Sequence, residues 1–167
     1  MDMVRPDEAE MAFDPLDVVE HVLTAENLPF DRTADGDLAF ALAGDWKDYE
    51  LWFAWRPDCE PLHFTCAFDM QVPKARRPSI YPLLAFVNER LWLGHFDMFS
   101  DEGMVVFRHA MLLRGGHGAT PEQMVDLVQA SLAECERYYP AFQFGLGGGK
   151  SPEEAIAASI LDTQGEA

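Results

Sequence analysis

Two histidines and an aspartate fall on one predicted hairpin, and their side chains are of the types that bind metal ions. The segment 95–112 reads as two strands around a turn at Asp101–Gly103. A three-residue turn would place His95 directly opposite His109, with Asp97 diagonal to His109 on the same face. Imidazole and carboxylate groups ligate divalent metals, and two close imidazoles can also form a pH-sensitive pair. The alternative is that they are two polar residues near a hairpin end. The pattern supplies no further ligand, so we predict no metal ion and no cofactor. We keep His95 and His109 only as a candidate metal-binding pair.

The cysteines and one glycine-rich loop are the other places where catalysis or phosphate binding would be sought. Cys59 has His63 four residues further on, but no third residue completes a nucleophile and its base. Cys66 and Cys135 fall on apolar faces and read as small core residues. Gly147–Ser151 ends like a phosphate-binding loop, yet it lacks the earlier glycine and follows a helix instead of a strand. We therefore predict no enzymatic activity, and a linker into a capped helix at this loop.

Length, charge and cysteine usage bound the class of protein. A chain of 167 residues is long enough for one domain whose core needs no disulfide staples. The net charge of −17 repels nucleic acid and anionic lipid, so we expect neither as a partner. Three cysteines at loose spacing indicate no disulfide framework and favour a reducing cytoplasm. The chain shows no basic leader and no run of about 18 apolar residues, so we expect neither a secretory signal nor a membrane span.

The spacing of hydrophobic residues changes along the chain, and it predicts the helices and strands that would position the candidate histidines and cysteines. Helical spacing and capping residues predict helices at 14–27, at 77–93 and from Thr120 to Pro140, where the proline bends or ends the helix. Alternation predicts strands at 30–33, 37–44, 49–56, 62–70, 95–100 and 104–112. Ser151 and Glu154 form a capping box that opens a short helix to about Leu161.

The order of these elements predicts the fold class. Strands run together and helices are segregated, which is typical of α+β proteins with an antiparallel sheet flanked by helices. The expected order is α-β-β-β-α-β-β-α plus a short C-terminal helix, with 30–33 as an optional short strand in the first group. We expect a disordered N-terminus at 1–13, a single α+β domain at 14–146, and a Gly-rich linker with a helical tail at 147–167.

Several predicted strands carry apolar side chains on both faces. On the last strand, Val105 and Phe107 lie on one face, while Val106 and Ala110 lie on the other. An antiparallel sheet with one wet face alternates more cleanly than this. Helices can cover one face, and we expect a second copy of the chain to cover part of the other; the alternative cover is the C-terminal helix. The residues expected at this homodimer contact are Phe86, Trp92, Phe96, Met98 and Val106.

Three segments resemble the YbjN family of small bacterial proteins: Pro82–Asn88 (PLLAFVN), Tyr139–Phe142 (YPAF) and the tail GGGKSPEEAIAASILDTQGEA. The resemblance runs roughly from Asp14 to the end of the chain. It implies a fold like that of type III secretion chaperones, usually homodimeric, and a role labelled as sensory transduction regulation. The matching segments are packing and tail features, so they carry over no functional residues. The extra tail helix departs from the chaperone pattern.

These features together predict a non-enzymatic, cytoplasmic protein-binding module, chaperone-like or regulatory, that acts as a homodimer. It would offer apolar grooves and strand edges, within an acidic field, to an extended partner protein. The alternative is a small-molecule or metal-sensing domain with a pocket near the 95–112 hairpin. Neither nucleic acid nor membrane is expected as a partner.

Overall fold

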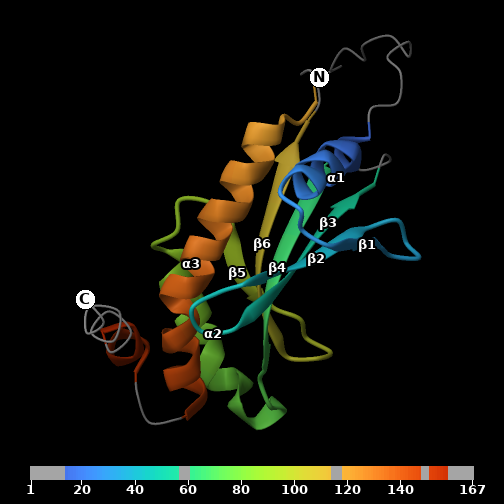
Figure 1. Cartoon of the computed structure of the whole chain (residues 1–167). Coiled ribbons are helices and arrows are strands. Elements are labelled where there is room, and N and C mark those ends of the chain that lie inside the picture. Colours follow the sequence, from blue (N-terminus) through green and yellow to red (C-terminus); the bar gives the residue numbers. More distant parts are fainter. Residues whose placement is uncertain (1–13, 57–60, 114–117, 148–150, 158–167) are drawn as a thin grey trace, which may run out of the picture.

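The computed structural model describes residues 14–56, 61–113, 118–147 and 151–157. Its six-stranded antiparallel sheet has the order β1-β2-β3-β4-β6-β5 (Figure 1). The strands are β1 (Phe30–Arg32), β2 (Leu38–Ala43), β3 (Asp48–Trp55), β4 (Pro61–Gln71), β5 (His95–Met98) and β6 (Met104–Leu112). The helices are α1 (Pro15–Ala25), the 3-10 turn η1 (Lys74–Arg76), α2 (Arg77–Asn88) and α3 (Pro121–Gly147), and residues 152–157 are also helical. The predicted α+β class with an antiparallel sheet is confirmed.

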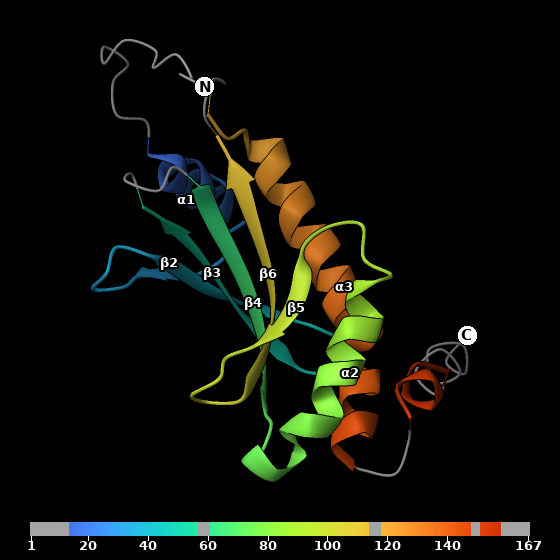
Figure 2. The same cartoon turned by 180° about the vertical axis from the view of Figure 1, so that it is seen from behind.

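The helices gather on one side of the sheet. α1 and α3 lie side by side across one face, and α2 packs on α3 and on the edge strand β5 (Figure 1). Seen from behind, the strands have no described helix in front of them (Figure 2). The sheet therefore has a helix-covered face, which holds the core, and a helix-free face.

Capping residues explain where α1, α3 and the helix at residues 152–157 begin. Asp14 Oδ1 accepts a hydrogen bond from the N–H of Leu16 at 2.9 Å, and Pro15 takes the first helical position. The segments 120–123 and 151–154 each close a capping box, with one hydrogen bond in each direction between the first and last residue. These starts agree with the sequence predictions, because a cap is a local interaction that the sequence itself specifies.

The structure decides one helix end that the sequence left open and corrects another. Pro140 does not end α3, which continues through it. A proline inside a helix costs about 3 kcal/mol, but Ala141 and Phe142 are fully buried directly after it, and their burial favours continued helix. α2 ends at Asn88 instead of Leu93, because the Asn88 side chain bonds the backbone of β5 and the chain turns back there.

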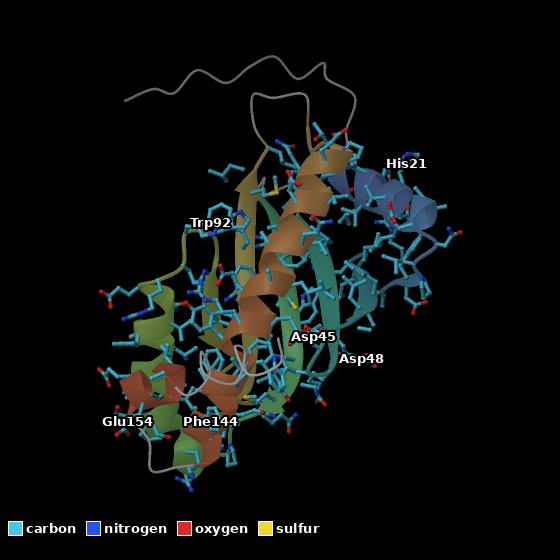
Figure 3. The ribbon with its side chains drawn as sticks, turned by 60° about the vertical axis from the view of Figure 1, so that its left-hand side comes forward. His21, Asp45, Asp48, Trp92, Phe144 and Glu154 are labelled. Carbon is cyan, nitrogen blue, oxygen red and sulfur yellow. The ribbon has the colours of Figure 1, made fainter. Side chains whose placement is uncertain are left out.

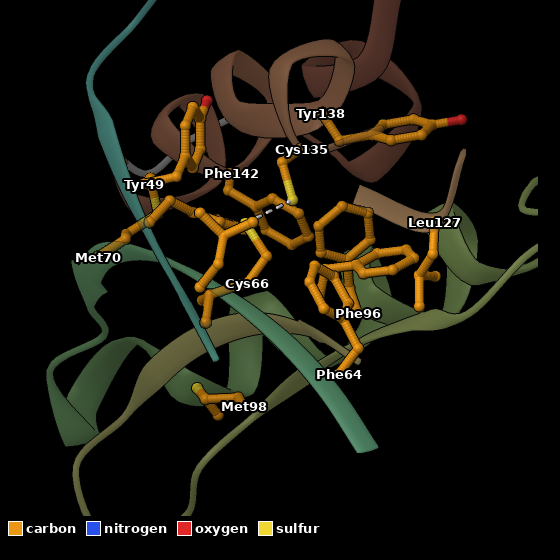
Figure 4. Close-up of a cluster of buried hydrophobic side chains, with 14 of the residues drawn as sticks. Tyr49, Phe64, Cys66, Met70, Phe96, Met98, Leu127, Cys135, Tyr138 and Phe142 are labelled. Carbon is orange, nitrogen blue, oxygen red and sulfur yellow. Dashed lines mark hydrogen bonds between the residues drawn. The ribbon is translucent and has the colours of Figure 1, made fainter. Parts of the chain in front are cut away.

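Aromatic rings fill the core beneath the C-terminal half of α3 (Figure 4). The ring of Phe96 in β5 lies 5.2 Å from the ring of Phe142 in α3 and 5.9 Å from that of Tyr138, between ring centroids. The Phe68 ring of β4 lies 5.7 Å from the Phe142 ring. Tilted and edge-to-face pairs of this kind stabilise a core beyond the area they bury. We call this group the aromatic end: Phe68, Phe96, Tyr138 and Phe142.

Candidate functional site

The structure separates the two histidines of the predicted hairpin. β5 and β6 pair with His95 opposite Arg108, one residue away from the expected register. The turn holds residues 100–103, because the pair that closes it is 99 with 104. Since side chains alternate between faces, a shift of one residue puts His95 and His109 on opposite faces of the sheet. The prediction that they face each other is wrong.

Each histidine has different surroundings from those expected. On the helix-free face, next to His95, Asp97 Oδ2 accepts a hydrogen bond from Arg108 Nη1 at 3.0 Å. On the helix-covered face, burial lowers the pKa of His109, and the charge of His95 lowers it further. Within the described residues, no three His, Cys, Asp or Glu side chains gather around a common point that would hold a metal ion. His95 and His109, kept only as a candidate pair, lie on opposite faces of the sheet and do not form the site that the expected register would have given.

Three of the five residues expected at a dimer contact are buried within the single chain. Phe96, Met98 and Val106 have almost no exposed surface, and Phe96 belongs to the aromatic end. A side chain buried by its own chain has no surface to give to a second copy, so these three are withdrawn from the contact. Trp92 is 77% exposed and stands in the turn between α2 and β5 (Figure 3). Phe86 is half-buried, with the Arg90 guanidinium 3.6 Å from its ring centroid.

The helix-free face is richer in apolar side chains than a solvated sheet face normally is. Across β2, β3, β4 and β6, the register puts Ala39, Trp52, Thr65 and Arg108 in one row. The neighbouring row is Ala41, Glu50, Ala67 and Val106. At one end of β6, Leu112 is 81% exposed. The described part of the tail does not cover this face, because its Ala155 and Ile156 are buried in the core on the helix-covered side.

The β5 edge of the sheet is closed by side chains. Asn88 Nδ2 donates to the carbonyl of Phe96 at 2.9 Å, and the N–H of Phe96 donates to Asn88 Oδ1 at 2.7 Å. Two residues on, the N–H of Met98 donates to Asp97 Oδ1 at 2.8 Å. An added strand needs free outward backbone groups, and these bonds occupy them. Side chains therefore close the β5 edge to an added strand at Phe96 and at the N–H of Met98.

An apolar pocket of about 240 Å³ lies between α1, α3 and the strands β2 and β3. Phe40 and Phe53 of the sheet contribute to it, together with Val22 of α1 and Val128 of α3. Glu26 and Gln129 are its polar lining residues, and both are exposed. We call it the α1–α3 pocket. Sequence reasoning missed it, because its lining comes from four elements far apart in the chain and each of its residues fits an ordinary core pattern.

A second, polar pocket of about 340 Å³ lies at the turn of the hairpin, close to where the sequence placed an alternative ligand site. Its lining joins Lys74 and Arg77 to the acidic turn 100–103. The Arg77 guanidinium donates to the carbonyls of Val72, Ser100 and Asp101. This arginine therefore holds the turn in place, and its guanidinium has a structural role.

The two described cysteines lie in contact inside the core. The Sγ atoms of Cys66 in β4 and Cys135 in α3 are 3.6 Å apart (Figure 4). Burial raises the pKa of the Cys135 thiol, and this disfavours the nucleophilic thiolate. Both are core residues, as predicted. Cys59 and residues 148–150 of the glycine-rich loop lie outside the described residues.

No helix in the described part of the chain is long and apolar enough to cross a membrane.

Comparisons with known proteins agree with the fold. The family model YbjN, described as "Putative bacterial sensory transduction regulator", matches residues 15–144. A crystal structure of YbjN from E. coli, described as "a putative transcription regulator", is similar with a TM-score of 0.52 and 15% sequence identity. The match covers 71% of this chain and 84% of that one, and at this identity it shows a shared fold. No curated protein matches the chain.

Proposed function

The chain belongs to the YbjN family, and from this premise we propose that it is a regulatory protein that binds other proteins, acts as a homodimer and catalyses no reaction itself. The family description supports a regulatory role. The net charge of −17 disfavours direct contact with nucleic acid, so regulation would pass through a protein partner. The buried thiols Cys66 and Cys135 are compatible with work in a reducing cytoplasm.

The main support for a homodimer is the apolar character of the helix-free face. Its exposed or half-buried apolar residues are Ala39 and Ala41 of β2, Trp52 and Ala54 of β3, and Ala110 and Leu112 of β6. Apolar side chains gathered on one face of a soluble protein can mark an interaction site. A second copy of the chain would place its own helix-free face there about a two-fold axis, as in most homodimers. Pairing two such faces removes apolar surface from water without moving any buried residue.

Mass measurement by light scattering during size-exclusion chromatography tests this arrangement. We expect the wild-type chain at twice its mass of 18.8 kDa. Ala110→Asp and Leu112→Asp should both give monomer, because each puts a charge at the contact while leaving an exposed position exposed. Tyr81→Asp is the matched control, since Tyr81 is also exposed but belongs to α2. A monomeric wild type, or a dimer that survives both β6 substitutions, would contradict the proposal.

Phe86 and Trp92 form the second candidate contact, because they are the expected dimer residues that keep some exposure. Trp92→Asp distinguishes the two surfaces in the same measurement. If the dimer uses the helix-free face, Trp92→Asp leaves the mass unchanged. If Trp92→Asp alone gives monomer, the contact lies at the turn between α2 and β5, and the helix-free face is not the interface.

A further inference from the structure

We propose that the α1–α3 pocket receives one large apolar side chain from a basic segment of a partner protein. This inference rests on the proposed protein-binding function and deepens it by naming the surface and the chemistry of the partner. Two observations carry it: an apolar pocket of limited size, and an acidic surround without basic lining residues.

The size of the pocket favours a side chain over a complete small-molecule ligand. Small-molecule sites usually span about 300–1,000 Å³, and this pocket holds about 240 Å³. Its inner surface is apolar: Leu23, Phe40, Phe53 and Met124 are all buried. Val22 and Val128 are half-buried on the flanking helices. An aromatic or leucine side chain from a partner could occupy such a pocket as an anchor, in the way that interfaces concentrate their binding energy.

The charges around the pocket favour particular residues next to the anchor side chain in the partner's sequence. Glu26 lines the pocket, and Glu122 and Asp126 are exposed on the adjoining half of α3. Nearby Arg32 is held by carboxylates of α1, with its Nη2 3.4 Å from Asp17 and 3.1 Å from Glu20. The surface beside the pocket is therefore acidic, which favours Lys or Arg next to the anchor. A fatty acid or an acidic peptide would meet repulsion at the same place.

A phage-displayed library of random dodecapeptides, selected on the full-length protein, provides the test. We expect the selected peptides to carry Lys or Arg around a Leu, Phe or Trp. Their affinity, measured by calorimetry, should fall with rising salt because exposed charges contribute to it. Selected peptides that are neutral or acidic would overturn the inference.

Substitutions at the pocket then locate the binding. Val128→Trp fills the pocket and should weaken the selected peptides at least about tenfold; Val22→Phe is the second filling variant, used if Val128→Trp lowers the melting temperature. Glu26→Lys should weaken them about threefold to tenfold, and a lysine at this helix C-terminus is favourable for α1. Ala133→Trp and Glu153→Lys are matched controls at exposed positions outside the pocket lining.

The outcomes separate this inference from the proposed function. Peptides that bind filled and unfilled pockets equally would overturn the pocket inference and leave protein binding standing. Failure to select any peptide would overturn the pocket inference alone, because a folded partner protein could still bind elsewhere on the surface. A filled pocket that converts the dimer to monomer would show that a second copy is the occupant, which also overturns the inference. The dimer contact itself is tested independently by the substitutions on β6.

Discussion

The two halves of the layer beneath α3 are built differently. Under the C-terminal half, rings from β4, β5 and α3 meet at centroid distances of 5.2–5.9 Å and leave the aromatic end filled. Under the N-terminal half, α3 lies beside α1, and the aliphatic side chains between them leave the α1–α3 pocket. Valine is shorter than phenylalanine, so Val22 and Val128 do not close the space between two helices and a sheet. One helix therefore contributes both to a close-packed core and to the lining of a pocket.

The largest expected effect comes from breaking the filled half. Phe142→Ala should destabilise the fold by about 3–5 kcal/mol. The rings around Phe142 are packed against one another, so they cannot move to fill the cavity that the substitution leaves. Met124→Ala, next to the existing pocket, should cost less, at about 2 kcal/mol. Urea denaturation at one fixed protein concentration measures both. Equal costs would contradict the contrast between a filled and an unfilled half.

A smaller effect tests how the aromatic end is closed at its outer edge. Asn88→Ala removes both partners of the Phe96 backbone and should cost about 1–3 kcal/mol. Asn88→Asp keeps the acceptor for the Phe96 N–H but loses the donor. Its free energy of unfolding should therefore lie between those of the wild type and of Asn88→Ala. Amide hydrogen exchange at Phe96 should quicken in Asn88→Ala. Unchanged exchange there would mean that Asn88 does not protect this edge.

A third substitution tests the helix that flanks the unfilled half. Asp14→Ala removes the N-cap of α1 and should cost about 1 kcal/mol. Asp14→Ser keeps a capping oxygen and removes the charge, so it should recover most of that loss if the cap is what matters. Thermal unfolding followed by circular dichroism measures both variants. Equal losses in the two variants would assign the effect to the charge near Arg32 instead.

The smallest effect is the pH dependence from His109. Its pKa is lowered in the folded protein, chiefly by burial and then by the charge of His95, so the unfolded state binds the proton more readily. Stability from this group is therefore present above about pH 6.5, the unfolded value, and is lost as the pH falls through the lower folded pKa. His109→Gln should lose less stability than wild type between neutral and mildly acidic pH. A steeper fall in His109→Gln would reverse this sign.

The sequence located most elements because their signals are local. The alternation along 104–112 predicted β6 with the bounds that the structure has, and the capping residues predicted the starts of α1 and α3. The short segment at Phe30–Arg32 also forms a strand, as the sequence allowed. Buried cysteines at 66 and 135 were predicted from their place on apolar faces. Each of these features depends on residues within a few positions of one another.

The candidate sites were harder to predict, because they depend on register and contact. One extra residue in the turn 100–103 reversed the faces of His95 and His109. Phe96, Met98 and Val106 look like surplus apolar residues in the sequence, yet the fold buries all three. The α1–α3 pocket has no sequence signal at all. The periodicity of the sequence does not give the distances between helices and strands, and the pocket depends on those distances.

By itself the sequence determined the α+β class, the helix starts, the strands and an acidic character, since these follow from hydrophobic period, caps and composition. Only the tertiary structure decided that α3 continues through Pro140, that side chains close the β5 edge, and that the sheet keeps one face free of described helices. It also decided where the core is filled by rings and where a pocket remains. Those outcomes depend on which side chains meet across the fold, and burial of Phe142 outweighs the local preference of Pro140 for that reason.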